Sequence, residues 1–257
     1  MNKNLLLQSM LVILLVSLPA SATVILDEPF DYVDNAALNA AWNGFSSNPD
    51  YTLDTAFGNG QPSYQMPSPG GNFQGRLANN LGGDYNGTDV QPLQFSIDIY
   101  LPETGASALW NGSRHFVELR GYSGDAYGSG GLENIIALGL NNASGDVFSN
   151  QFFQARIFLG GDWYTLDANV GTPGRSVGWH TLMAQIKSTT IDFYVDGVLA
   201  ETLARANALG FDNVVLGSDL TANGNTVWVD NILVESVPEP ATLLLLGIGG
   251  LALRRRK

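Results

Sequence analysis

Among the side chains of this sequence that could take part in catalysis, most are carboxylates. Their spacing argues against hydrolysis of a glycosidic bond. Cleaving a glycosidic bond needs two carboxyl groups that face each other across it. On a strand such a pair comes from acids two or four residues apart, because alternate side chains share a face. Within residues 23–236 no two glutamates lie four or five residues apart, and Glu118 stands alone in His115–Arg120. A hydrolase would have to pair distant acids, such as Glu118 with Glu133. We expect a non-enzymatic protein, with a polysaccharide-active hydrolase as the alternative.

Other catalytic or metal-binding side chains are scarce. The sequence has no cysteine, which excludes a disulfide framework, a thiolate metal site and a cysteine nucleophile. Its two histidines, His115 and His180, do not have metal-ligand spacing. No Gly-x-Ser-x-Gly motif marks a serine nucleophile, and no motif points to a Ser–His–Asp triad. We expect His180, which lies in an alternating apolar segment, to serve packing.

Aromatic side chains in polar loops are better candidates for binding. Trp110, Tyr122, Tyr127 and Trp163 lie in or beside stretches rich in Gly, Asn and Asp. An aromatic face that reaches solvent can stack on a sugar ring while polar neighbours bind the hydroxyls. These four residues are the predicted ligand contacts of a glycan site. The alternative is that their rings pack in a core.

The charge of the chain is uneven. The region between Thr23 and Val237 holds seven Lys and Arg against 23 Asp and Glu, a net charge of −16. Such a surface repels phosphate backbones, which argues against nucleic-acid binding. It suits solubility outside the cell, and it would also suit divalent cations or cationic partners.

The N-terminal 22 residues have the composition of a signal peptide. Lys3 supplies a positive start, an apolar run follows over Leu5–Leu18, and Ala20 and Ala22 form an A-x-A cleavage site. We therefore expect export and a mature start at Thr23. The alternative, a core strand or helix of the domain, does not explain this order of features.

The C-terminal segment has three parts with different physical properties. It contains a proline motif, an apolar run over Leu243–Leu253 and a basic end; the motif is Val237, Pro238, Glu239, Pro240, Ala241 and Thr242, and the basic end is Arg254, Arg255, Arg256 and Lys257. The prolines break a preceding strand. A helix over Ala241–Leu253 would be only about 20 Å long, whereas a bilayer core is about 30 Å thick. The basic end would stay cytoplasmic. This short transmembrane helix suits transient membrane attachment, and an ordinary short anchor is the alternative.

In its order and spacing, this tail resembles the PEP-CTERM sorting signal. The resemblance implies recognition by an exosortase-type membrane protease and transient attachment to the inner membrane. It also implies display at the cell surface or release into the extracellular matrix of a Gram-negative bacterium that makes exopolysaccharide.

The body between the two ends has the pattern of an all-β protein. Apolar and polar residues alternate in several short segments, as in half-buried strands, and Ile135–Leu140 is continuously apolar, as in a strand buried on both faces. The alternating segments are Phe95–Leu101, Phe153–Leu159, His180–Ile186 and Ile191–Val195, and Val227–Val234 forms the last strand. Asp196-Gly197 predicts a two-residue hairpin turn. We expect an antiparallel β-sandwich.

The remaining local patterns predict one helix and several loops. Asn35–Trp42 fits a short helix, because Ala37, Leu38 and Ala41 match its period. The stretches Asn43–Pro49, Gly58–Gly75 and Asn79–Gly87 are rich in Asn and Gly and are predicted to be loops.

Short motifs in the body resemble concanavalin A-like, laminin-G-type jelly rolls. They are Gly178-Trp179-His180, Tyr194-Val195-Asp196-Gly197 and Asp230-Asn231-Ile232, with Phe30-Asp31-Tyr32 and Trp42 near the mature start. Relatives of the laminarinase type carry a Glu-x-Asp-x-Glu strand, which this sequence lacks. In such jelly rolls the first and last strands are neighbours, so the resemblance implies that Asp27, Glu28 and Asp230 could share a Ca²⁺ ion. The alternative is that these acids face solvent or cap turns.

These observations divide the chain into a signal peptide (1–22), a β-sandwich (23–236) and a sorting signal (237–257). The prediction is an exported, non-enzymatic surface or matrix protein that binds glycans through its sandwich.

Overall fold

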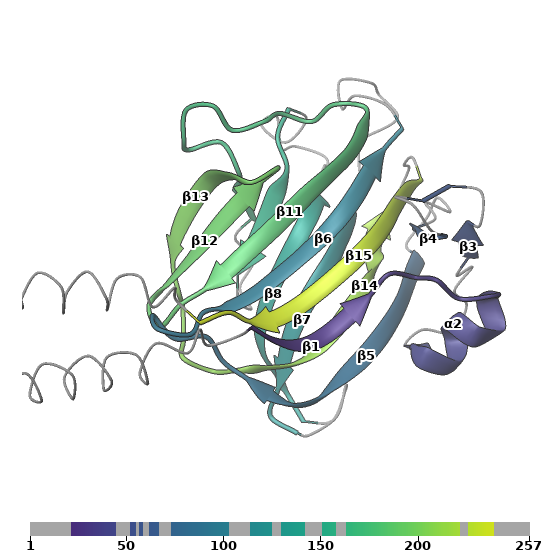
Figure 1. Cartoon of the computed structure of the whole chain (residues 1–257), viewed down its shortest axis with the longest axis horizontal. Coiled ribbons are helices and arrows are strands. Elements are labelled where there is room, and N and C mark those ends of the chain that lie inside the picture. The colour runs from purple at the N-terminus through teal and green to yellow at the C-terminus, as the bar shows by residue number, and fades with distance from the viewer. Residues whose placement is uncertain are drawn as a thin grey trace, which may run out of the picture.

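The computed structural model describes residues 22–44, 52–54, 57–58, 62–66, 73–102, 114–124, 130–141, 151–157, 163–221 and 226–238. Figure 1 shows two antiparallel β-sheets packed face to face, with one short helix at their edge. The predicted signal peptide up to Ser21 and the sorting tail from Glu239 lie outside the described residues. Among the residues that are described, no helix is long and apolar enough to cross a membrane.

The sheet that we call sheet A has the strand order β13-β12-β11-β6-β15-β4-β3, and β1 also pairs with β15. Its strands are β1 (Thr23–Glu28), β3 (Thr52–Asp54), β4 (Ser63–Met66), β6 (Leu93–Leu101), β11 (Gly178–Ile186), β12 (Thr190–Val195), β13 (Val198–Ala204) and β15 (Val227–Ser236). Sheet B has the order β10-β9-β8-β7-β14-β5-β2. Its strands are β2 (Asn43–Gly44), β5 (Phe73–Tyr85), β7 (Arg114–Tyr122), β8 (Leu132–Asn141), β9 (Gln154–Ile157), β10 (Trp163–Thr165) and β14 (Phe211–Thr221).

The main core lies between the two sheets. Strand β6 alternates buried and half-buried residues along its whole length, so Phe95, Ile97 and Ile99 face sheet B. Val117 and Leu119 of β7 enter the same core from sheet B. Each such side chain contributes about 1.5–3 kcal/mol by leaving water. The all-β prediction is therefore confirmed. The alternation of apolar and polar residues correctly predicted which face of these strands packs in the core.

The predicted hairpin and the predicted helix are both present. Strands β12 and β13 pair across Asp196 and Gly197, whose φ angles of 50° and 77° are those of the expected tight turn. Helix α2 (Asn35–Ala41) begins after Asp34, whose carboxylate accepts a hydrogen bond from the Ala37 amide. Strand β8 is buried on both faces from Asn134 onward, as its continuous apolar run predicted.

All three predicted loops are wrong in part, and Asn43–Pro49 begins with the two-residue strand β2. Asn79–Gly87 belongs largely to β5, which pairs with β14 through Asn79 opposite Val214 and Asn80 opposite Asn213. The stretch Gly58–Gly75 contains β4, which pairs with β15. Asparagine and glycine have low intrinsic strand preference, but pairing with a central strand outweighs a preference of about 1 kcal/mol.

The first and last strands are neighbours, as the jelly-roll resemblance implied. Thr23 lies opposite Ser236, and Glu28 lies opposite Ile232. The Val237 amide then donates a 2.9 Å hydrogen bond to the Pro92 carbonyl. The predicted signal cleavage point after Ala22 and the start of the proline motif therefore lie side by side at one end of sheet A.

Candidate functional site

The face of sheet B that points away from the main core carries a line of polar side chains. Val117 and Leu119 of β7 face the core, so Glu118, Arg120 and Tyr122 project from the opposite face. Arg120 bonds to the Glu118 carboxylate and donates a 2.9 Å hydrogen bond from Nη1 to the Tyr122 hydroxyl. Burial alone would lower the pKa of Arg120, but the adjacent Glu118 charge raises it overall. Glu118, Arg120 and Tyr122 thus share one face of β7, with Glu118 as the one acid among them.

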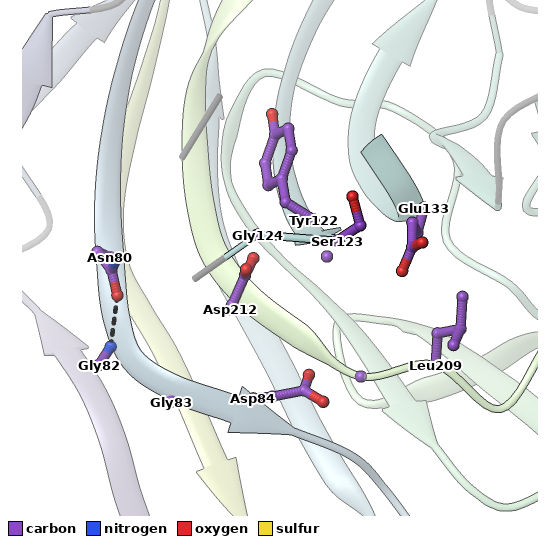
Figure 2. Close-up of a pocket in the computed structure, with 12 residues that line it drawn as sticks. Asn80, Gly82, Gly83, Asp84, Tyr122, Ser123, Gly124, Glu133, Leu209 and Asp212 are labelled. Carbon is purple, nitrogen blue, oxygen red and sulfur yellow. Dashed lines mark hydrogen bonds between the residues drawn. The ribbon is translucent and has the colours of Figure 1, made fainter. Parts of the chain in front are cut away.

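This line ends at an open pocket of about 610 Å³ (Figure 2). Tyr122 and three acids, Asp84, Glu133 and Asp212, stand around the cavity on separate strands and connections. Apart from Leu209, the rest of the lining is small or polar and consists of Asn80, Gly82, Gly83, Gly121, Ser123, Gly124 and Gly210.

Two glycines allow the walls of the pocket to approach closely. A Cβ on Gly121 of β7 would collide with the Gly210 carbonyl oxygen, and a Cβ on Gly210 would collide with the Asp84 carboxylate. Because both positions lack a side chain, the segment before β14 lies against β7 and Asp84 reaches over it. The acids are thereby brought to one cavity although they are far apart in sequence.

The pocket is rich in hydrogen-bond acceptors. Ionised carboxylates only accept hydrogen bonds, and several of them around one cavity match a ligand with many hydroxyl donors. Among the described residues, no group of three or more His, Asp or Glu side chains is placed to hold a metal ion. The pocket therefore fits a polyhydroxylated ligand with a ring that can lie beside Tyr122.

Asp212 differs from its neighbours because it is only 7% exposed. Burial raises its pKa above the ordinary aspartate value, and the nearby Asp84 charge acts in the same direction, although the Asn213 side-chain amide donates to it. Folded protein therefore holds this proton more tightly than unfolded protein, so ionisation of Asp212 lowers stability as pH rises through the raised pKa.

Asp212→Asn is expected to become more stable relative to the natural protein as pH rises from about 4 to about 7. Melting temperatures of the two proteins over this pH range measure the difference. Asp84→Asn, at an exposed position of the same pocket, is the matched control and should change the pH profile less. A constant difference between Asp212→Asn and the natural protein would contradict the raised pKa.

The predicted ligand contacts are only partly brought together. Tyr122 lines the pocket. Trp163 packs on Phe116, with ring centroids 5.4 Å apart, and under the Arg156 guanidinium, and it is half-buried, so its role as a ligand contact stays a prediction. Trp110 and Tyr127 lie outside the described residues. Asp84 and Asp212 were missed, although a Gly-Gly-Asp sequence ends at Asp84, and Glu133 was considered only as a distant partner of Glu118.

Glu118 and Glu133, the distant pair considered for hydrolysis, do not face each other. Glu118 lies opposite Ala137 of β8, and Glu133 is four residues farther along that strand. At about 3.3 Å per residue this is roughly 13 Å, beyond the ~5–9.5 Å that glycosidase pairs span. Glu118 is also bound by Arg120.

The three acids predicted to bind calcium do not form a cluster of metal ligands. Glu28 is 5% exposed, and its carboxylate accepts hydrogen bonds from the Phe30 amide (2.7 Å), the Tyr32 hydroxyl (2.5 Å) and Trp42 Nε1 (2.8 Å). Burial and the Glu28 charge raise the pKa of Tyr32, which keeps this hydroxyl a donor. Glu28 therefore ties the chain after β1 to the residue that ends α2.

Asp27 and Asp230 lie apart from this arrangement. Asp27 is exposed and lies opposite Leu233, whereas Asp230 is buried and accepts a hydrogen bond from the Asn231 amide. This last contact lies within β15, beside the positive φ of Asn231, where the pairing of β15 with β6 shifts register. Calcium binding by these acids remains a prediction without a supporting ligand cluster.

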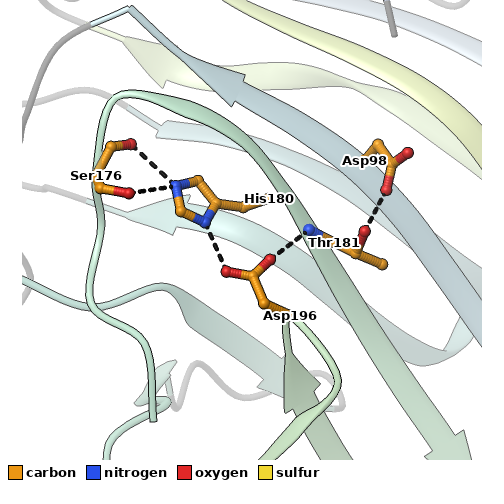
Figure 3. Close-up of polar contacts among 5 residues, drawn as sticks. All are labelled: Asp98, Ser176, His180, Thr181 and Asp196. Atoms are coloured by element: carbon orange, nitrogen blue, oxygen red, sulfur yellow. Dashed lines mark hydrogen bonds and ion pairs between the residues drawn. The ribbon is translucent and has the colours of Figure 1, made fainter.

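A Ser–His–Asp arrangement lies at the end of β11 (Figure 3). His180 Nδ1 is 2.8 Å from Asp196 Oδ2, and Nε2 is 3.0 Å from both the hydroxyl and the carbonyl oxygen of Ser176. Both ring nitrogens are therefore engaged in hydrogen bonds, and which of them donates depends on the tautomer.

The same arrangement has a clear role in holding the hairpin. Asp196 Oδ1 accepts from the Thr181 amide, and the His180 ring lies 5.1 Å from the ring of Phe153. The network thus ties the β12–β13 turn to β11 and seals the end of the core. The expected packing role of His180 is confirmed.

Comparisons with known proteins provide evidence on both the C-terminal tail and the fold. Residues 236–257 match the PEP-CTERM protein-sorting motif. The chain carries an exosortase sorting signal. This signal indicates export and membrane-associated sorting toward the cell surface, and its first residues follow β15 directly, with no spacer. No curated protein matches the sequence.

Solved structures share the fold at low sequence identity. The endo-1,3-beta-glucanase of Streptomyces sioyaensis is 18% identical, with a TM-score of 0.56 over 87% of this chain and 99% of that one. The carbohydrate esterase vb_24B_21 of bacteriophage phi24B is 16% identical, with a TM-score of 0.53 over 84% and 100%. The CBM2 module of the Lactobacillus casei phage J-1 evolved Dit is 13% identical, with a TM-score of 0.51 over 85% and 97%. The predicted concanavalin A-like jelly roll is confirmed. At sequence identities this low, the similarity supports the fold alone.

Proposed function

We propose that this protein is an exported surface or matrix protein, processed by an exosortase, that binds neutral glycans at the pocket of sheet B without cleaving them. The acceptor-rich pocket beside Tyr122 carries the proposal, because its carboxylates match sugar hydroxyls and its ring offers a stacking face. The net charge of −16 between Thr23 and Val237 favours neutral over anionic polysaccharides. Three proteins of the same fold carry carbohydrate-related names, which supports this choice of ligand.

Hydrolysis is the second candidate, and one observation favours it. Asp212 has a raised pKa and shares the pocket with Asp84 and Glu133, and glycosidases use a carboxyl group of raised pKa together with a second carboxyl group. Incubating the protein with soluble β-1,3-glucan and measuring new reducing ends separates the candidates. We expect binding without new reducing ends.

Binding at the pocket is tested with Asp84→Asn and Glu133→Gln, which keep side-chain shape and remove the charged acceptors. Each is expected to weaken binding of soluble β-1,3-glucan about tenfold, the worth of one hydrogen bond to a charged group. Affinity electrophoresis measures the retardation. Asp167→Asn, at an exposed site outside the pocket, is the matched control. Unchanged retardation of both pocket variants would refute binding at this site.

A further inference from the structure

A row of aromatic side chains crosses the outer face of sheet A. Trp179 of β11 lies opposite Tyr100 of β6, and Tyr100 lies opposite Trp228 of β15. Their chain neighbours Ile99, His180 and Val229 point into the core, so all three rings project from the solvent side. The rings are half-buried, and two strand spacings make the row about 10 Å wide.

Phe57 completes this group, which we call the aromatic surface (Phe57, Tyr100, Trp179 and Trp228). The Phe57 ring lies 4.6 Å from Trp228 and 6.2 Å from Trp179, with interplanar angles of 39° and 30°. Tyr100 meets Phe57 edge-on, with centroids 4.4 Å apart and planes at 78°. Because each ring is held by its neighbours, the faces that reach solvent are ordered before any ligand arrives, which lowers the entropy cost of binding.

Polar groups border the aromatic surface. Trp228 Nε1 donates a 3.0 Å hydrogen bond to Asp54, which orients the indole. In the next row along the strands, the Asp98 carboxylate accepts from the Thr181 hydroxyl and from the Asn231 amide, and Figure 3 shows Asp98 and Thr181 side by side. Thr181 and Asn231 are exposed, so hydroxyl and amide groups lie within about 7 Å of the rings.

This combination selects one class of ligand. An apolar row bordered at once by hydroxyl, amide and carboxylate groups matches a sugar ring, which has an apolar face and a polar rim. A protein partner would need a broader apolar core than one row across three strands. Asp54 and Asp98 would repel an anionic polymer, so the matching ligand is a neutral polysaccharide.

We propose that the aromatic surface is a second glycan-binding site, which stacks on the sugar rings of a neutral polysaccharide. It lies on the outer face of sheet A, whereas the pocket lies on sheet B, so one molecule can hold two chains and cross-link them. The proposal that sugar rings stack on the aromatic surface does not depend on binding at the pocket. Cross-linking rests on the proposed function, because it needs both sites.

The test uses the purified protein and two neutral polymers, soluble β-1,3-glucan and soluble cellulose ether, with alginate as the anionic comparison. Trp179→Ala and Trp228→Ala are each expected to weaken retardation by at least one neutral polymer about 10- to 30-fold. Met183→Ala, on the same face of β11, is the matched control and should bind normally. Trp179→Phe keeps an aromatic face and should retain most of the binding, which separates lost stacking from lost folding.

Two further readouts separate this site from the pocket. Asp84→Asn/Glu133→Gln should leave quenching of tryptophan fluorescence by the bound polymer in place, whereas Trp179→Ala should reduce it. Light scattering should show polymer-dependent aggregates with the natural protein and none when either site is changed. If folded Trp179→Ala and Trp228→Ala bind both neutral polymers as the natural protein does, the aromatic surface is not a glycan site. Equal binding of alginate would overturn the proposed selectivity for a neutral polysaccharide. Quenching lost only in the pocket variant would also overturn it.

Discussion

Glu28→Ala is expected to lower the free energy of unfolding by about 3–5 kcal/mol, although residue 28 belongs to neither proposed binding site. The substitution removes the acceptor for the Phe30 amide, the Tyr32 hydroxyl and Trp42 Nε1. Trp42 and Phe30 are fully buried, so their N–H groups lose their partner where little water can replace it. Each buried donor left unsatisfied costs about 1–3 kcal/mol.

Denaturant unfolding of Glu28→Ala measures this loss. Asp27→Ala, one residue earlier on the exposed side of β1, should change stability by less than about 0.5 kcal/mol. Melting in EDTA and then in excess Ca²⁺ tests the calcium hypothesis on the same protein. The hydrogen bonds of Glu28 predict an equal midpoint in both conditions, and a large rise with Ca²⁺ would instead assign Glu28 to a metal site.

Arg120→Ala is expected to cost about 3–5 kcal/mol, because it leaves the Glu118 carboxylate buried without its counter-charge. Glu118 is 2% exposed and Arg120 is 4% exposed, so water cannot replace the lost partner. Tyr122 also loses the donor that holds its hydroxyl, which should loosen the wall of the pocket. Glycan binding at the pocket should therefore weaken together with stability.

The double variant Glu118→Leu/Arg120→Met separates charge from packing. Replacing a buried pair by apolar residues of similar size is often neutral, so the double variant should recover most of the stability lost in Arg120→Ala. Thermal melts of the three proteins make the comparison. If the double variant is as unstable as Arg120→Ala, the cost comes from packing around β7 rather than from an uncompensated charge.

The predictions from the sequence were correct where the signal lies in neighbouring residues and failed where it depends on distant ones. The turn at Asp196-Gly197 and the short helix predicted at Asn35–Trp42 depend on residues that are close together in the chain, and both are present. The segment Asn79–Gly87 was predicted to be a loop but belongs largely to strand β5. The prediction failed because β14, the strand that pairs with it, lies more than a hundred residues away in the sequence. Composition describes a segment alone and says nothing about the strand that it will meet.

The binding surfaces show the same division. Tyr122 was a predicted ligand contact, but the acids around it were not, since Asp84, Glu133 and Asp212 meet only where close-packed glycines bring the strands together. Trp179 and Trp228 could have faced either side of their strands. Cross-strand register placed both on the outer face beside Tyr100, and a slip of one residue would have buried them.

By itself, the sequence determined the sorting signal at residues 236–257, the all-β class and the strands whose alternation is complete, because each of these depends on neighbours along the chain. Only the tertiary structure decided that Glu28 is bound by hydrogen bonds, that three acids share one pocket and that three rings form one row. The pocket and the row of rings join residues from distant strands, and their positions depend on pairing between strands that no local pattern encodes. The Glu28 bonds depend on how the chain after β1 folds back through α2 to Trp42.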